Sequence, residues 1–107
     1  MKRYTVWVNR DAATDLIGIR DYIAGARGRE FAKEFTGRIV AYATTLQRAP
    51  HRGTIHDQIR PGLRTVTWDK TVTLAFSVSD KARAVTIVAI FYRGRDILAE
   101  LKKRSEP

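Results

Sequence analysis

The sequence predicts one α+β domain over residues 1–107, in which helices pack on an antiparallel β-sheet. Apolar residues recur at helical spacing in the first half of the chain and at strand spacing in the second half. A chain of 107 residues with 44% hydrophobic content suits a single core. The predicted order of elements is β-α-α-β-β-β-α, with an N-terminal strand, an αα-hairpin and a C-terminal helix.

The first predicted strand covers residues 4–8, where apolar and polar residues alternate. Asn9 follows as the N-cap of the first helix, because its side-chain oxygen can accept a hydrogen bond from a free backbone amide. Asp15 lies in the first turns of this helix, where the helix dipole favours negative charge. The helix carries one apolar stripe, which consists of Ala12, Leu16, Ile19 and Ile23.

Gly25 and Gly28 break this helix in the prediction, and a second helix runs from about Glu30 to Ala49, before Pro50. The two helices are expected to form an αα-hairpin, because only a few residues separate them. The inner face of the second helix is predicted to comprise Ala32, Phe35, Ile39, Tyr42 or Ala43, and Leu46.

Residues 50–62 show no apolar periodicity and contain two of the three prolines, so they predict a loop without regular structure. Thirteen residues make a long connection for a compact domain, and long loops often carry function. We therefore expect this loop to contribute to a working site.

Three strands follow, at residues 63–68, 71–78 and 84–92, and short polar turns join them into a meander. The last of these strands is apolar on both faces, which predicts a central position in the sheet with cover on both sides. A final helix is predicted at residues 96–104, where three basic residues suit the negative end of the helix dipole.

The chain is strongly basic, with 20 Lys and Arg residues against 11 Asp and Glu residues and a net charge of +9. Fourteen of the basic residues are arginines, whose planar guanidinium forms paired hydrogen bonds with phosphate or carboxylate. This charge favours an acidic partner, either nucleic acid or an acidic protein. A plain nucleic-acid-binding module is less favoured, because the sequence has no evident recognition helix or aromatic-rich strand motif.

Arg64 is unusual, because strand alternation places it on the same face as Val66 and Trp68, where apolar side chains are expected. A guanidinium on such a face needs a partner or a groove, so Arg64 is a candidate binding residue. Trp68 and Trp7 could stack on a ligand, but both lie on strands that face helices and are expected in the core.

The residue types disfavour several kinds of chemistry. The sequence contains no cysteine, which excludes disulfides and thiolate metal ligands. His51, His56 and Asp57 are the nearest approach to a metal site, but no rigid spacing holds them, so neither a metal nor a cofactor is expected. The N-terminal residues are too weakly apolar for a signal peptide or a membrane span, so we expect a cytoplasmic protein without a membrane partner.

RNA cleavage is the enzymatic alternative, because it needs cations around a phosphate together with a base and an acid. In this hypothesis Arg64, Arg93 and Arg95 surround the phosphate, and Tyr92 or His56 moves the protons. Proton-transfer groups are scarce near these arginines, and a guanidinium stays protonated near neutral pH. We therefore expect binding without catalytic residues, with nuclease activity as the alternative.

Four segments carry a family resemblance, and they occur at residues 15–23, at residues 46–50 followed by Gly53, at residues 59–64, and at residues 85–96. In this order they resemble the RelE/ParE superfamily of type II toxin–antitoxin toxins, and its ParE branch in particular. Each segment alone is weakly specific. Four segments in a matching order of elements, over nearly the whole chain, make the resemblance specific.

The resemblance implies a small bacterial toxin with a cognate antitoxin, whose acidic C-terminal segment wraps the toxin in a hetero-oligomer. Operator DNA would be contacted only through the antitoxin. Resemblance to ParE-like members implies inhibition of DNA gyrase by binding. Resemblance to RelE-like members implies ribosome-dependent cleavage of mRNA. RelE-like enzymes carry lysines near the second-strand arginine and a C-terminal tyrosine or histidine, whereas residues 34–69 contain no lysine and residues 98–104 offer neither group.

The residues expected to bind the antitoxin or the target lie on the first helix and near the ends of the later strands. Arg64 and Arg95 match arginines that both branches of the superfamily share, so they do not discriminate between the branches. The full set of expected binding residues is Arg60, Arg64, Trp68, Arg93, Arg95, Leu16, Arg20 and Ile23.

Overall fold

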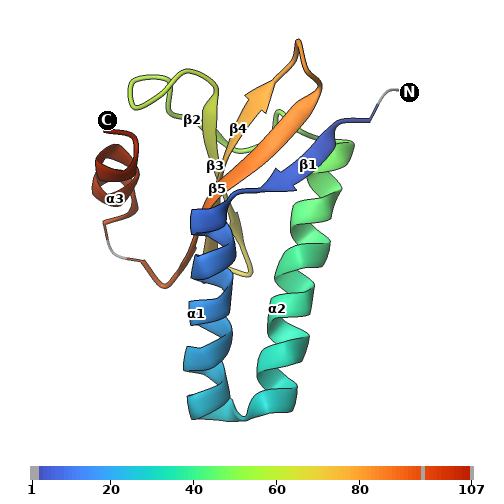
Figure 1. Ribbon diagram of the computed structural model, residues 1–107, viewed down its shortest axis with the longest axis vertical. Coiled ribbons are helices and arrows are strands. Elements are labelled where there is room, and N and C mark those ends of the chain that lie inside the picture. The colour runs from blue at the N-terminus through green and yellow to red at the C-terminus, as the bar shows by residue number, and fades with distance from the viewer. Residues whose placement is uncertain (1–2, 95, 107) are drawn as a thin grey trace.

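The computed structural model describes residues 3–94 and 96–106 and has the predicted α+β class (Figure 1). Two long helices form a hairpin against one face of a five-stranded sheet, and a short third helix packs on the other face. The elements are β1 (Thr5–Val8), α1 (Arg10–Arg27), α2 (Arg29–Thr44), a 3₁₀ turn (Thr45–Gln47), β2 (Thr54–Ile55), β3 (Leu63–Trp68), β4 (Val72–Ser79), β5 (Ala84–Tyr92) and α3 (Ile97–Arg104).

The sheet has the strand order β1-β5-β4-β3-β2. Strands β3 to β5 form the predicted antiparallel meander, and β2 pairs antiparallel with β3. The edge strand β1 runs parallel to β5. Strand β2 was not predicted, since it lies within residues 50–62, for which we expected no regular structure. It contains only Thr54 and Ile55, which are too few for alternation to show in the sequence.

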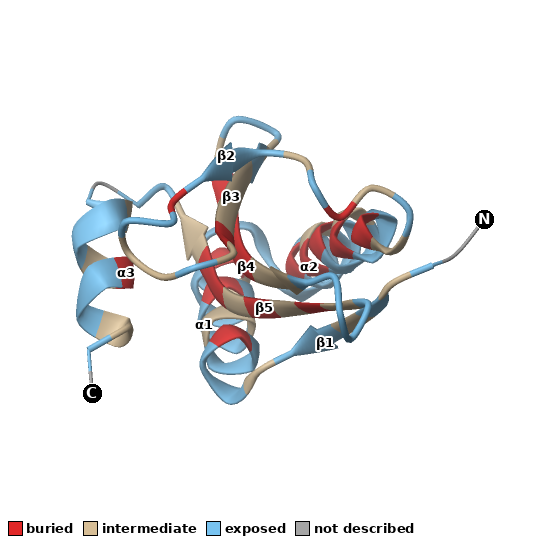
Figure 2. Ribbon diagram, turned by 90° about the horizontal axis from the view of Figure 1, so that it is seen from above, coloured by how far each residue is buried: buried red, intermediate tan, exposed pale blue. Residues whose placement is uncertain are grey.

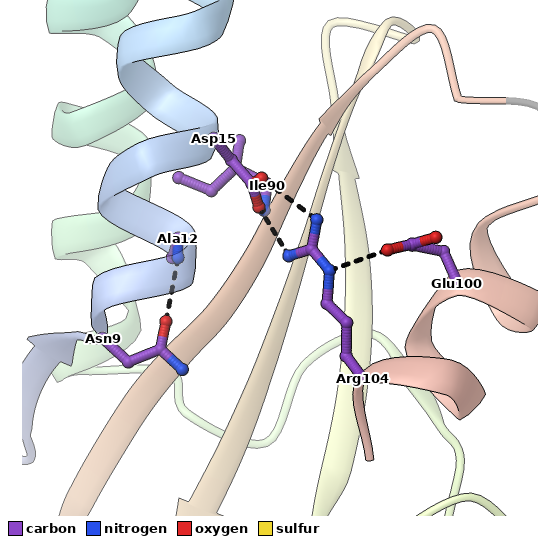
Figure 3. A network of polar contacts seen from close by, with 6 residues as sticks. All are labelled: Asn9, Ala12, Asp15, Ile90, Glu100 and Arg104. Carbon is purple, nitrogen blue, oxygen red and sulfur yellow. Dashed lines mark hydrogen bonds and ion pairs between the residues drawn. The ribbon is translucent and has the colours of Figure 1, made fainter. Parts of the chain in front are cut away.

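Local chemistry explains the helix ends. Asn9 caps α1, since its side-chain oxygen accepts a hydrogen bond from the amide of Ala12 at 2.9 Å (Figure 3). Gly28 has a φ of 93°, which glycine adopts readily, and the chain reverses there between α1 and α2. Gly25 lies inside α1, so of the two predicted helix breakers only Gly28 acts as one. Helix α2 ends at Thr44, earlier than predicted, and the 3₁₀ turn follows it.

The hydrophobic core lies on both faces of the sheet (Figure 2). The larger cluster fills the space between the αα-hairpin and the sheet, where Ile19, Ile39 and Phe76 are buried. The smaller cluster lies under α3, where Leu101 packs with Leu63 of β3. Strand β5 contributes to both clusters and lies between β1 and β4, which confirms its predicted central position.

A β-bulge in β5 changes which of its residues face the hairpin. One extra residue, Val88, is inserted where the pairing with β4 shifts register. Ile87 packs in the hairpin-side core before the bulge, and Ile90 does so after it. The amide of Ile90 donates a hydrogen bond to the carboxylate of Asp15 in α1, at 2.9 Å. Simple alternation would not predict this link between β5 and α1.

The prediction that Trp7 lies in the core is wrong, since this residue is 59% exposed. Val6 takes the core-facing position in β1, so alternation turns Trp7 to the other face of the sheet. Helix α3 covers that face but lies far from β1 (Figure 2). Trp68 is partly buried and packs against the core, as expected.

Candidate partner-binding site

A side groove lies between α1 and the last residues of β5. Strand β1 pairs with β5 only as far as Ile87, so beyond that point α1 lies beside β5. Its volume is about 430 Å³, which is large enough for side chains of a partner. The residues that line it include Thr14, Gly18 and Ile19 from α1, and Ile90, Tyr92 and Arg93 from the end of β5.

A second cavity, which we call the hairpin pocket, lies where the αα-hairpin extends beyond the sheet and faces the turn between β3 and β4 (Figure 1). Its volume is about 370 Å³. It shares Tyr22, Tyr92 and Arg93 with the side groove, so the two cavities meet at these residues. The hairpin pocket is also lined by Arg27, Phe31, Phe35, Asp69 and Thr71.

A row of aromatic rings connects the core with the surface at this place. The ring of Trp68 in β3 lies 5.6 Å from Phe35 in α2, and Phe35 lies 5.7 Å from Tyr92 in β5. Tyr92 in turn lies 6.0 Å from Tyr22 in α1, which is 63% exposed. These centroid distances are typical of stabilising aromatic pairs. Trp68, an expected binding residue, belongs to this row, which continues from it to Tyr42 at 6.5 Å.

Arg93 is the expected arginine that lies at both cavities. It adopts a left-handed conformation with a φ of 55°, and its amide donates a hydrogen bond to the carbonyl of Thr71 at 2.8 Å. Its exposed guanidinium lies 5.1 Å from the ring centre of Tyr92, within the range of a cation–π contact. The strand end thus presents a positive charge on an aromatic surface.

Arg60 and Arg64 lie on opposite faces of the sheet. Arg60 donates a hydrogen bond to the hydroxyl of Ser77. Ser77 pairs with Leu63, so both side chains lie on the face of the sheet that α3 covers. Arg64 lies on the hairpin side and donates to the backbone carbonyl of His51 at 2.8 Å. Its guanidinium, which we expected to need a partner on this face, is therefore bonded to a backbone oxygen.

The expected binding residues of α1 differ in their accessibility. Arg20 is exposed and lies 3.7 Å from the carboxylate of Asp21. Leu16 is partly buried against the core, and Ile23 is almost fully buried within it. Leu16 and Ile23 thus mainly support the core. Arg95 lies outside the described residues.

The residues of the nuclease alternative lie at two ends of the sheet. Arg64 pairs with Phe76 in β4, whereas Tyr92 pairs with Val72. These β4 residues are four positions apart, which corresponds to about 13 Å along a strand. His56 lies near Arg64, but it is buried and its Nε2 bonds to a threonine hydroxyl at 2.8 Å. Within the described residues, the arginines and proton-transfer groups named in the nuclease alternative therefore do not surround one phosphate.

The histidines of residues 50–62 have separate local roles. His51 bonds to Asp80, and His56 bonds to Thr65. Within residues 3–94 and 96–106, no three His, Asp or Glu side chains are grouped so that they could hold a metal ion. None of the helices in the same part of the chain is long and apolar enough to span a membrane.

A polar clasp joins α1, β5 and α3, and we did not predict it (Figure 3). Arg104 donates two hydrogen bonds to the carboxylate of Asp15, at 2.9 and 3.1 Å, and a third to Glu100 at 3.0 Å. The pKa of Arg104 is raised above its ordinary value, mainly because of the hydrogen bonds to Asp15. Asp15 also accepts the amide of Ile90, so one carboxylate fixes two elements. Its partners are distant in sequence, which leaves no local signal.

A second polar group lies at the turn between β4 and β5. Asp80 accepts a hydrogen bond from the hydroxyl of Tyr4 at 2.7 Å and lies 2.6 Å from Nε2 of His51. The bond from Tyr4 is the main cause that lowers the pKa of Asp80, and the bond from His51 adds to it. The bond between Tyr4 and Asp80 also raises the pKa of Tyr4.

This group predicts a small pH dependence of stability. Because the pKa of Asp80 is lower in the folded chain, its contribution is present above the ordinary value of 3.8 and is lost as the pH falls through the folded value. We expect the stability difference between the wild type and Asp80→Asn to shrink below about pH 4. Urea unfolding at about pH 6 and pH 3 measures this difference, and equal values at both would contradict the prediction.

Several solved structures are similar to this chain. A chain of the chromosomal ParDE system from P. aeruginosa is 26% identical, with a TM-score of 0.72 over 85% of this chain and 97% of that chain. A chain of the RelBE2 toxin–antitoxin complex from Mycobacterium tuberculosis is 20% identical, with a TM-score of 0.62 over 85% and 99% of the two chains. The isolated E. coli RelE toxin is 14% identical, with a TM-score of 0.53 over 94% and 97%. No curated protein sequence matched this chain.

The class of the protein is the RelE/ParE superfamily of toxins, as the ParDE neighbour and a family match show. A family model described as the ParE toxin of the type II toxin–antitoxin system, parDE, matches residues 6–97. The chain therefore belongs to the ParE toxin family of type II toxin–antitoxin systems. The resemblance to the ParE branch is confirmed.

Proposed function

We propose that this ParE-family toxin is neutralised by a cognate antitoxin with an acidic C-terminal segment, and that the free toxin inhibits DNA gyrase by binding. The net charge of +9 supports an acidic partner, because opposite charge speeds encounter and favours the correct complex. The toxin–antitoxin neighbours support a hetero-oligomer with that antitoxin. In this proposal the complex is cytoplasmic, and operator DNA is contacted only through the antitoxin.

One observation carries the non-catalytic part of the proposal. Arg93 and Tyr92 lie at one end of the sheet, while Arg64 and the buried His56 lie at the other. A ribonuclease needs a base, an acid and cations within reach of one phosphate. Because these groups are dispersed, binding explains the surface better than proton transfer does.

A paired assay with one variant tests this proposal. We expect the purified toxin to inhibit supercoiling by gyrase and to leave mRNA intact on translating ribosomes. Tyr92→Phe keeps the ring and removes the hydroxyl, so we expect gyrase inhibition to stay within about twofold of the wild type. If Tyr92 moved protons instead, cleavage would fall by about 100-fold or more in this variant. Cleavage by the wild type without any effect on gyrase would overturn the proposal.

A further inference from the structure

The hairpin pocket presents two cations over aromatic rings. The guanidinium carbon of Arg27 lies 4.2 Å from the ring centre of Phe31, and that of Arg93 lies 5.1 Å from the ring centre of Tyr92. Neither arginine forms an ion pair with a carboxylate in the part of the chain that the structure describes. Stacking holds a guanidinium by its face and leaves its N–H groups available for an acceptor with two oxygens.

Thr71 adds a hydroxyl that has no partner. Its Oγ1 is the buried side-chain polar atom that lacks a hydrogen bond within the described residues, and Thr71 lines the hairpin pocket. A buried hydroxyl without a partner lowers stability, so native proteins rarely keep one without a reason. The atom has almost no accessible surface in the unbound chain, so an oxygen of a ligand in the pocket would supply the missing partner after a rotation of the Thr71 side chain.

Three of the four described non-glycine residues with a positive φ angle lie at the same place, and the fourth, Arg83, lies in the turn between β4 and β5. Asp69, Lys70 and Arg93 adopt positive φ angles of 54°, 60° and 55°, although none of them is glycine. Asp69 and Arg93 line the pocket, and Lys70 lies between Asp69 and Thr71 in the turn. Asp69 and Lys70 are the central residues of a hairpin turn closed by a hydrogen bond from the Thr71 amide to the Trp68 carbonyl, and such a turn requires a positive φ at both. Arg93 lies outside this turn, so its positive φ is the one that a binding role would explain.

We propose that the hairpin pocket binds an acidic residue and the adjoining apolar side chain of the antitoxin's C-terminal segment. The carboxylate accepts hydrogen bonds from the hydroxyl of Thr71 and from the guanidinium groups of Arg27 and Arg93. The apolar side chain packs on the rings of Phe31 and Phe35. This inference rests on the proposed function, which supplies the acidic partner, and adds the place and chemistry of recognition.

A peptide fits this pocket better than nucleic acid does. A nucleic-acid strand carries a phosphate at every nucleotide and requires cations along its whole path. Here Asp69 lines the same pocket as the two arginines and interrupts the positive charge. One carboxylate beside an apolar side chain needs only the two cations, the hydroxyl and the rings. The pocket therefore matches a short acidic and apolar segment.

Thr71→Val separates binding from folding, because valine keeps the shape of threonine and removes the unpaired hydroxyl. We expect the thermal stability of this variant to be equal to or above that of the wild type. We expect its affinity for the antitoxin to fall about tenfold, since one hydrogen bond to a charged group is lost. Calorimetric titration with the purified cognate antitoxin measures the affinity. A purely structural role of Thr71 would leave this affinity unchanged.

Matched arginine variants test the charges. Arg27→Gln and Arg93→Gln are each expected to weaken antitoxin binding about tenfold. Arg10→Gln removes the same charge from an exposed position of α1 outside the pocket, and we expect a change of less than about twofold.

The outcomes distinguish the pocket from the proposed function. Equal affinity of the wild type, Thr71→Val and Arg27→Gln would overturn the pocket assignment and leave the proposed function standing. If these variants lost gyrase inhibition but kept their affinity for the antitoxin, the pocket would bind the target instead. This result would also overturn the assignment of the pocket to the antitoxin. Failure of the wild type to bind the antitoxin would overturn the proposed function itself.

Discussion

Replacing Gly53 with alanine is expected to lower the free energy of unfolding by about 2–4 kcal/mol. Gly53 has a φ of 88°, a conformation in which a residue with a side chain is strained. An added Cβ would also overlap the carbonyl oxygen of Thr65 in β3. Thr65 is held by pairing with both β2 and β4, so its backbone cannot move without the loss of sheet hydrogen bonds. Urea unfolding measures this change.

Gly25→Ala is the matched control for this experiment. Gly25 lies inside α1, and a Cβ added there meets no atom within 4 Å. Because alanine is a better helix former than glycine, we expect this variant to gain up to about 1 kcal/mol in stability. A loss below about 1 kcal/mol for Gly53→Ala would show that the turn before β2 tolerates a side chain. Gly53 belongs to a segment that resembles the toxin superfamily, and this geometry is a physical reason for glycine there.

Asp15→Ala is expected to lower the free energy of unfolding by about 2–3 kcal/mol. It removes the bidentate partner of Arg104 and the acceptor of the Ile90 amide together. The side chains of Asp15 and Arg104 are 16% and 26% exposed. We therefore expect a smaller loss of stability than for a fully buried ion pair. Since Arg104 belongs to α3, we also expect faster amide exchange in α3.

Two variants separate the parts of this effect. Asp15→Asn keeps an oxygen for the amide of Ile90 but loses the charge, so it should cost about half as much as Asp15→Ala. Asp21→Ala removes a carboxylate from the same helix, where its contact with Arg20 is exposed, and should change stability by less than about 0.5 kcal/mol. Equal losses for Asp15→Ala and Asp21→Ala would mean that the clasp does not stabilise the fold.

The elements with strong periodic patterns were predictable from the sequence. The stripe of α1 places Ile19 and Ile23 in the core, and the apolar run of β5 places it at the centre of the sheet. Strand β2 was missed because two residues cannot show a period. Trp7 was misplaced because periodicity assigns a side chain to a face, and it does not tell how far a helix covers that face.

The candidate site was predictable in residue type more than in arrangement. Arg93 and Trp68 were expected to bind a partner, which stays a prediction. In the structure Arg93 lines the hairpin pocket, and Trp68 belongs to the row of aromatic rings beside it. The positions of Thr71, Arg27 and Phe31 at the hairpin pocket were not predicted, because this pocket forms only where the two helices extend past the turn between β3 and β4. Residues that meet there are separated by some forty positions in the chain, so no local pattern joins them.

By itself the sequence determined the α+β class, the αα-hairpin, the basic charge and the family, because spacing, capping residues and composition act locally or sum over the chain. Only the tertiary structure decided the partners of the arginines. Arg64 faces a backbone carbonyl, Arg104 closes the clasp, and Arg93 is stacked on Tyr92 beside a pocket. A guanidinium acts through the groups that face it, and the register of the sheet, the bulge in β5 and the packing of α3 set those groups.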